Sequence, residues 1–206
     1  MTVDESLRRL RRSEKYLGMW AIGADTSAVP VITADRVGLP DVGDVHGRLL
    51  ALVLLGLKGQ GLGQVEVFAF ADAYDVWPAL DAAEHDFVLD DAPQQHDLVQ
   101  AAWRFDAAWV LLWALGLVNH LVFPDRPCDP ARVVEASLTG IAAVSAGSRP
   151  GLRPLGELLD SADVALRLRA VSDAAREAGL AMPSGLDPGV VHERAAAFAW
   201  LLRVRQ

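Results

Sequence analysis

The sequence has few residues suited to disulfides, metals or cofactors. Of its 206 residues one is a cysteine, Cys128, so no internal disulfide can form and nothing favours an oxidising compartment. The five histidines include no two that lie three or four residues apart, the spacing that places two metal ligands on one helical face. Gly59, Gly61 and Gly63 follow an expected helix and lead to no Gly-Lys-Ser or Gly-Lys-Thr motif. We therefore expect no metal, no nucleotide and no other cofactor.

Long apolar runs and positive charge are also scarce. The longest apolar run, residues 107–118, is shorter than the roughly 20 residues that span a bilayer. The charged start of the chain shows no signal peptide, so we expect a cytoplasmic protein without a membrane segment. The formal net charge of -8 makes nucleic acid a poor partner, because phosphate binding needs a concentrated positive surface. A basic cluster near the start is expected to be a solvated helix face, with a docking or membrane-surface role as the alternative; it comprises Arg8, Arg9, Arg11 and Arg12.

The residues that are present predict a packed helical protein. Apolar residues make up 52% of the chain and charged residues 22%, which is typical of a domain with a sizeable core. Strand signals are weak: residues 64–74 favour a helix over a strand, and residues 29–33 are a short strand or extended chain. We expect an all-α, bundle-like single domain over residues 1–206, with at most one small hairpin. Residues 1–40 form its N-terminal helix plus an irregular segment, and residues 41–206 form its helical core.

Capping residues indicate where several helices begin. Asp81 and Glu84 form a capping-box pattern. Asp129 and Asp187 each precede a proline, which combines an N-cap with a favoured first helical residue. Gly147 opens the most linker-like stretch, 147–154. The longer expected helices cover residues 6–17, 101–119, 130–146, 155–178 and 190–204, and another helix, capped by Asp41 or Asp44, runs to Lys58.

The expected helix over residues 101–119 carries a carboxylate among indoles. Trp103, Asp106, Trp109 and Trp113 are spaced by three or four residues, so they share one face. An ionised, unpaired carboxylate is costly to bury. Either Asp106 pairs with an arginine from another helix, such as Arg167 or Arg194, or its pKa rises and it becomes a candidate general acid or base.

Two other helices carry charged groups at helical spacing. Asp163 and Arg167 form an i,i+4 pair that we interpret as part of a solvated charged stripe, with an interior polar pocket as the alternative. Glu193 and Arg194 lie in the first turns of the last expected helix, where a carboxylate favours the helix dipole. The candidate catalytic residues are therefore Asp106, Asp163 and Glu193, and the candidate substrate-binding residues are Trp103, Arg104, Trp109, Trp113, Arg167 and Arg194.

Three long motifs, in this order and spacing, resemble one known family. They are WRFDAAWVLLWALGLV at 103–118, LRPLGELLDSADVALRLRAVSDA at 152–174 and PSGLDPGVVHERAAAFAWLL at 183–202. Arg11-Arg12-Ser13 and Cys128-Asp129 fit the same family, which is catalogued as domain of unknown function 4272. The resemblance covers most of the chain and implies a helical bacterial protein, with no established catalytic residues to carry over.

The sequence departs from the family pattern at polar positions. Arg169 and Ala170 stand where a His-Trp pair usually follows the second motif, and Ala199 replaces the asparagine that usually precedes Trp200. If those polar groups form a family site, this member has lost part of it. The resemblance therefore favours a degenerate or repurposed member.

Two classes of function remain open from the sequence. The first is a partner-binding accessory protein, or a subunit of a heteromeric complex, that binds another protein. The second is an enzyme of small-molecule metabolism that uses neither metal nor nucleotide. It would perform an elimination, a cyclisation or a hydrolysis with carboxylate acid-base residues, while arginines bind an anionic group of the metabolite.

Overall fold

The computed structural model describes residues 3–23, 26–145 and 151–203. These residues fold into helices and connecting segments, and no strand occurs among them, which confirms the all-α prediction. The chain divides into two compact units. Unit 1 comprises residues 1–40, 122–127 and 152–206, and unit 2 comprises residues 41–121 and 128–151.

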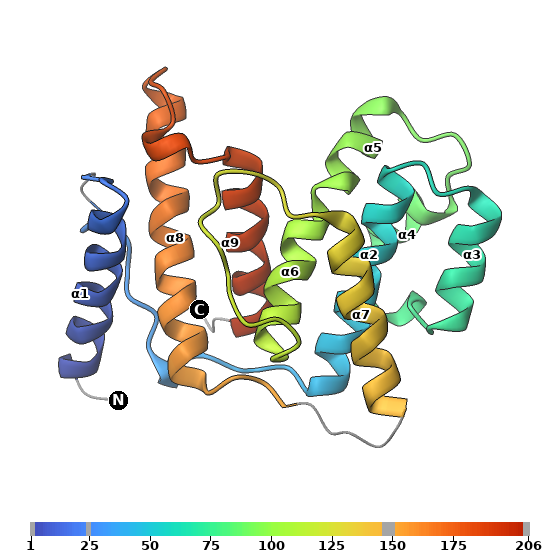
Figure 1. Cartoon of the computed structure of the whole chain (residues 1–206), viewed down its shortest axis with the longest axis horizontal. Helices are drawn as coiled ribbons and strands as arrows, with labels where there is room; N and C mark the ends of the chain where they lie inside the picture. Colours follow the sequence, from blue (N-terminus) through green and yellow to red (C-terminus); the bar gives the residue numbers. More distant parts are fainter. Residues whose placement is uncertain (1–2, 24–25, 146–150, 204–206) are drawn as a thin grey trace. The chain divides into compact units, whose positions relative to one another are not determined.

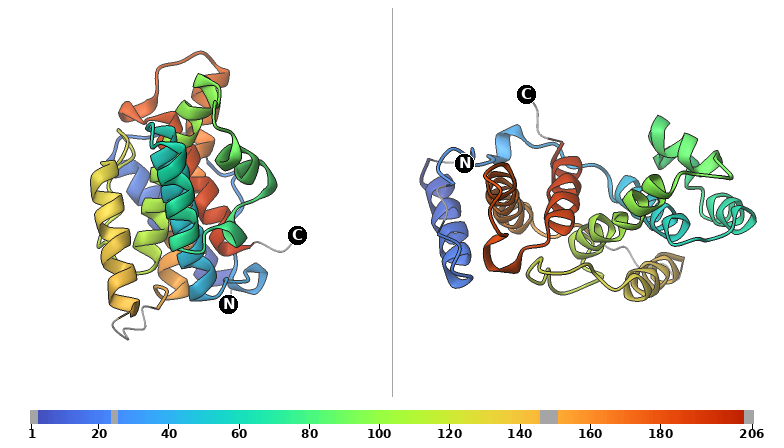
Figure 2. Two further views of the ribbon diagram at one scale, coloured as in Figure 1. Left: turned by 90° about the vertical axis from the view of Figure 1, so that its right-hand side faces the viewer. Right: turned by 90° about the horizontal axis from the view of Figure 1, so that it is seen from above.

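Three long helices build unit 1. They are α1 (Val3–Met19), α8 (Leu155–Glu177) and α9 (Pro188–Leu202), and the short turns η1 (Ala34–Arg36) and η3 (Pro183–Gly185) lie in the connecting segments. In Figure 1 α8 lies between α1 and α9, and the view from above in Figure 2 shows the same order. Their shared core comprises Leu17, Ile22, Phe123, Leu168, Val171, Leu186 and Val191.

Unit 2 is built around one helix that is apolar on nearly all sides. This helix, α2 (Val42–Gly59), is buried at every position from Leu49 to Gly56, as expected for a helix enclosed by others. It packs against every other long helix of the unit: α3 (Gln64–Ala73), α4 (Ala82–Leu89), α5 (Gln95–Ala102), α6 (Arg104–Ala114) and α7 (Pro130–Ser145). The turn η2 (Trp77–Ala79) also packs on it.

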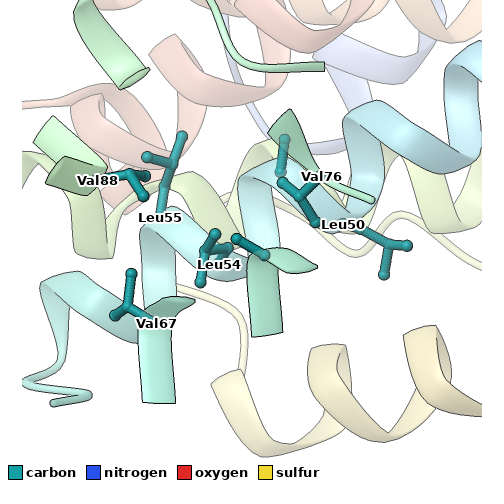
Figure 3. Close-up of a cluster of buried hydrophobic side chains, with 8 residues drawn as sticks. Leu50, Leu54, Leu55, Val67, Val76 and Val88 are labelled. Carbon is teal, nitrogen blue, oxygen red and sulfur yellow. The ribbon is translucent and has the colours of Figure 1, made fainter. Parts of the chain in front are cut away.

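The side of α2 that faces α3 and α4 carries an aliphatic cluster. Leu54 and Leu55 of α2 meet Val67 from α3 and Val88 from α4, as Figure 3 shows. All four side chains are almost completely buried. Burial of this kind stabilises a helix by about 1.5 to 3 kcal/mol per large aliphatic side chain, so the cluster fixes α3 and α4 on α2.

Two glycines let other elements approach α2 closely. A Cβ at Gly59 would lie 2.5 Å from the backbone nitrogen of Ala102 and 2.7 Å from the carbonyl oxygen of Leu98. A Cβ at Gly56 would lie 2.7 Å from the ring of Phe105. Glycine is therefore required where α5 crosses the end of α2, because any side chain would push the two backbones apart.

The capping predictions agree with the structure. The side chain of Asp81 accepts from the backbone nitrogen of Glu84, and the side chain of Glu84 accepts from the backbone nitrogen of Asp81. Asp129 accepts from the backbone nitrogen of Ala131 at the start of α7, and Asp187 accepts from Gly189 and Val190 at the start of α9. The prediction of a helix rather than a strand at 64–74 is confirmed by α3.

Some predicted boundaries were wrong. The expected helix over 101–119 is interrupted at Trp103, which separates α5 from α6, and it ends at Ala114 because Gly116 adopts a φ of 72°. Residues 29–33 form no strand. The predicted ends at residues 146 and 204 lie outside the described residues, as does the first half of the linker-like stretch 147–154. None of the described helices combines the length and hydropathy that a bilayer crossing demands.

Candidate functional site

A charged pair lies inside unit 1, between α1 and α8. Arg167 donates from Nε to Oδ2 of Asp163 at 2.8 Å, and both side chains are 0% exposed. Ser13 of α1 donates from its hydroxyl to the same carboxylate at 2.5 Å. The interpretation of this pair as part of a solvated stripe was wrong, because α1 packs on that face of α8.

The remaining donors of Arg167 bind the segment that follows α1. Its Nη1 donates to the carbonyl oxygen of Thr26 at 2.7 Å and to the hydroxyl of the same residue at 3.1 Å. Its Nη2 donates to Asp163 Oδ1 at 3.2 Å and to the carbonyl oxygen of Val29 at 3.4 Å. The guanidinium is therefore bound on all sides by the protein itself, as a buried charge requires.

A second arginine connects the same elements. Arg9 of α1 is buried and donates to Asp160 of α8 at 2.9 Å and to the carbonyl oxygen of Ile32 at 2.8 Å. The sequence analysis placed Arg9 on a solvated face and missed this role. The spacing indicated this burial, because Arg9, Ser13 and Leu17 are four residues apart and therefore share one face of α1, which is the buried face.

The other candidate residues of unit 1 lie at the start of α9. Glu193 and Arg194 are both buried, whereas the neighbouring His192 is exposed. Arg194 donates from Nη1 to the carbonyl oxygen of Val122 at 2.5 Å. Burial raises the pKa of Tyr16 above its ordinary value of 10.0, while Trp20 and the charge of Arg194 act against that rise. Unit 1 therefore contains ionisable side chains that are buried or partly buried, among them Glu193, Arg194 and Tyr16.

The remaining candidates lie on α6 or at its start, in unit 2. Asp106 is 1% exposed, and its Oδ2 accepts from the backbone nitrogen of Cys128 at 3.2 Å. Trp113 is buried, whereas Trp103, Arg104 and Trp109 are half-buried. Asp106 therefore fastens the segment before α7 to α6.

The structure brings the candidates together in two groups. Unit 1 contains Asp163 in contact with Arg167, and also Glu193 and Arg194. The indoles, Arg104 and Asp106 belong to unit 2. The assignment of these residues to catalysis or substrate binding stays a prediction.

Unit 2 also has a surface cavity that the sequence analysis did not predict. Its volume is about 420 Å³, and α4 and α5 supply most of its wall. The apolar part of the lining is Leu55, Ala83, Phe87 and Ala101. The polar part is Asp81, Glu84, Asp86, Asp90, Asp97, Gln100 and Arg104.

The carboxylates of the cavity differ in what already binds them. Asp81 and Glu84 are used in the capping box, and Arg48 donates from Nη2 to Glu84 at 2.7 Å. Asp86 and Asp97 are exposed, and no described residue donates to their side chains. The cavity therefore offers free carboxylates beside an apolar floor.

The negative charge of the protein is concentrated in the stretch of sequence that supplies most of this cavity. From Gly59 to Trp103 the sequence contains no lysine or arginine. It contains nine acidic residues in the same stretch: Glu66, Asp72, Asp75, Asp81, Glu84, Asp86, Asp90, Asp91 and Asp97. This stretch includes α3, α4 and α5, so these helices and their connections form a strongly acidic layer.

An aromatic row lies on the same layer. The ring of Trp77 is 6.2 Å from that of Phe68 on α3 and 5.4 Å from that of His85 on α4. Phe68 is 36% exposed, and Val65, one turn earlier on α3, is 78% exposed. The acidic layer thus also presents apolar and aromatic side chains to solvent.

One family model matches the chain, over residues 9–206, and its description is "Domain of unknown function (DUF4272)". No curated protein and no solved structure matches the chain. Within the described part, no set of His, Cys, Asp and Glu side chains is arranged to hold a metal ion. The match agrees with the resemblance seen in the three sequence motifs.

Proposed function

The chain belongs to the DUF4272 family, and we propose that this member is a partner-binding accessory protein that binds another protein through unit 2. The observation that carries the proposal is the acidic layer of α3, α4 and α5, with its cavity and its exposed apolar side chains. Exposed aromatic and apolar groups within a polar surface are typical of protein interaction sites.

The use of polar groups in unit 1 supports the same function. Asp163 and Arg167 bind each other and the backbone of the protein, and both are sealed from solvent. Such a network is typical of a structural ion pair that ties helices together. The enzyme alternative needs a substrate to reach a carboxylate, whereas Asp163 and Asp106 are almost completely buried.

Site-specific crosslinking in cells tests the proposal. A photoreactive amino acid is placed at Gln100 or Ala83, which line the cavity and are exposed. The matched control carries it at Glu177, which is exposed at the end of α8 in unit 1. We expect one discrete protein adduct from the cavity positions and none from the control.

Two outcomes contradict the proposal. In the first, the cavity positions give no protein adduct under conditions in which the photoreactive group is shown to react. In the second, Glu177 gives the same adducts as Gln100, which indicates collision rather than binding. Thermal unfolding of each variant, compared with the unmodified protein, checks that the inserted group leaves the fold intact.

A further inference from the structure

We infer that the partner binds unit 2 with a segment rich in lysine and arginine, and that one of its basic side chains enters the cavity between α4 and α5. This inference rests on the proposed function and adds the chemistry of the partner to it. The occupant is a segment of another protein.

Charge complementarity indicates that the partner segment is positively charged. The layer from Gly59 to Trp103 has nine carboxylates and no lysine or arginine of its own. Three cations adjoin this layer: Arg104 lines the cavity itself, Arg48 binds Glu84, and Lys58 binds the end of α4. The nine carboxylates therefore remain in excess of the nearby positive charges. A surface of one sign attracts a segment of the opposite sign and repels nucleic acid or an acidic peptide.

The cavity lining matches the form of a long basic side chain. Lysine and arginine have an apolar stem that packs on hydrocarbon and a charged head that needs acceptors. Leu55, Phe87 and Ala101 provide the apolar contact, while Asp86 and Asp97 provide acceptors that no described residue occupies. A carboxylate bound to such a head forms a charge-assisted hydrogen bond, about twice as strong as a neutral one.

The aromatic row offers a separate contact for a basic segment that extends beyond the cavity. His85 belongs to α4 but lies on the other face of that helix from its cavity-lining residues, so the row of Phe68, Trp77 and His85 is a separate surface of the same layer. Basic side chains bind the faces of aromatic rings through cation–π attraction. Within this protein, Lys58 already lies 5.2 Å from the ring centre of Phe87, so an aromatic–cation contact exists in this layer.

Peptide binding with matched charge variants tests the inference. The probes are a labelled peptide of alternating Lys, Arg and Leu residues, and the same peptide with every basic residue replaced by Gln. The test variant is Asp86→Asn with Asp97→Asn, in the cavity. The control is Asp41→Asn with Glu135→Gln, at exposed positions of unit 2 outside the cavity lining. Each variant removes the same amount of negative charge from the same unit.

We expect the basic peptide to bind the full chain and the Gln peptide not to bind, by fluorescence anisotropy. The cavity variant should weaken binding by about tenfold, because two charged acceptors of the bound side chain are lost at once. The control variant should weaken it by less than about threefold, as expected for a distant, screened charge. Binding should also fall at high salt.

Four outcomes overturn the inference. Equal weakening by both variants shows general attraction rather than a site. Absence of peptide binding, with crosslinking at Gln100 intact, leaves the proposed function standing and shows that the partner has another chemistry. Self-association seen by light scattering, and lost in the cavity variant, assigns the cavity to a second copy of the chain. Loss of both peptide binding and crosslinking removes the proposed function as well.

Discussion

Arg167 and Asp163 lie one turn apart on α8, and their ion pair is closed to solvent on both sides. An i,i+4 pair of this kind contributes about 0.2 to 0.5 kcal/mol on an exposed helix. Here its strength depends on Ser13 and Thr26, which supply the remaining hydrogen bonds from α1 and from the segment that follows it. The pair therefore connects three parts of unit 1 rather than stabilising one helix.

Removing one member of this pair should strongly destabilise the protein. Asp163→Asn leaves Arg167 charged and buried without its counter-ion, and loss of one partner of a buried pair costs about 3 to 5 kcal/mol. Urea unfolding measures the free energy. The control on the same helix is Asp173→Asn. Its partners Arg169 and Arg176 are 3.5 Å and 3.1 Å away, and all three side chains are at least 40% exposed. That change should cost less than about 1 kcal/mol. Similar losses for the two variants would contradict a special role for the buried pair.

A methyl group at Gly59 should separate α2 from α5. The added Cβ of Gly59→Ala would meet backbone atoms of Leu98 and Ala102 rather than a side chain that can rotate away. Overpacking of this kind costs about 1 to 3 kcal/mol, which thermal unfolding should show as a lower midpoint.

Gly43 is the matched control in the same helix. No atom lies within 4 Å of a Cβ placed there, so Gly43→Ala should leave stability unchanged or raise it by about 0.5 to 1 kcal/mol through the greater helix propensity of alanine. Equal stability of Gly59→Ala and Gly43→Ala would show that α5 does not lie too close to Gly59 for a side chain.

Much of the fold could be predicted because it follows from local signals. Asp81 with Glu84 and Asp187 before Pro188 place helix starts correctly, since a cap is decided by residues three or four apart. The interruption at Trp103 was missed because neighbouring apolar residues continue the helical period on both sides of it. No glycine or proline marks this interruption of the helix, so it depends on how α5 and α6 pack. The periodicity of apolar residues in the sequence does not show how two helices pack.

The environment of the charged residues could not be predicted, for a similar reason. Asp163 and Arg167 have the spacing of a surface pair, and burial comes from α1, about 150 residues away in the sequence. The cavity combines residues of α2, α4, α5 and the start of α6, which no local motif unites. The excess of acidic residues between positions 59 and 103 is visible in the sequence. That the helices carrying them lie together depends on how these helices pack.

His46 should make stability fall as the solution becomes acidic. Burial lowers the pKa of His46 below its ordinary value of 6.5, and no described group hydrogen-bonds its buried Nε2. Between the folded pKa and 6.5 the unfolded chain binds more protons, so the free energy of unfolding decreases as pH falls through this window. One proton changes it by at most about 1.4 kcal/mol per pH unit.

His46→Gln should remove this part of the pH dependence. The measurement is the urea midpoint of the variant and of the unchanged chain at a series of pH values below 7. The control His96→Gln alters an exposed histidine of α5 and should keep the full slope. Parallel curves for His46→Gln and the unchanged chain would show that the imidazole does not contribute.

Lys58 should be required to hold the end of α4 beside the cavity. Its Nζ donates to the side chain of Gln64 at 2.8 Å and to the carbonyl oxygens of Val88 at 2.9 Å and Asp90 at 2.5 Å. Lys58→Met keeps the apolar stem and removes all three of these hydrogen bonds, while the carbonyl oxygen of Val88 still accepts from Nε2 of Gln64. Since hydrogen bonds to a charged group contribute about 1.5 to 3 kcal/mol, we expect a loss of about 3 kcal/mol in unfolding free energy.

The loss should appear first in the last turn of α4, because Lys58 holds the carbonyl groups there. Hydrogen exchange of the amides of residues 86–90 should accelerate in Lys58→Met while amides of α8 keep their protection, since local opening is governed by local contacts. Lys15→Met changes an exposed lysine of α1 and should alter neither measurement. Burial lowers the pKa of Lys58 below its ordinary value, so holding its charge at this place costs free energy that the local hydrogen bonds offset. A uniform rise in exchange across both units would instead mean that Lys58 acts only on global stability and has no local role beside the cavity.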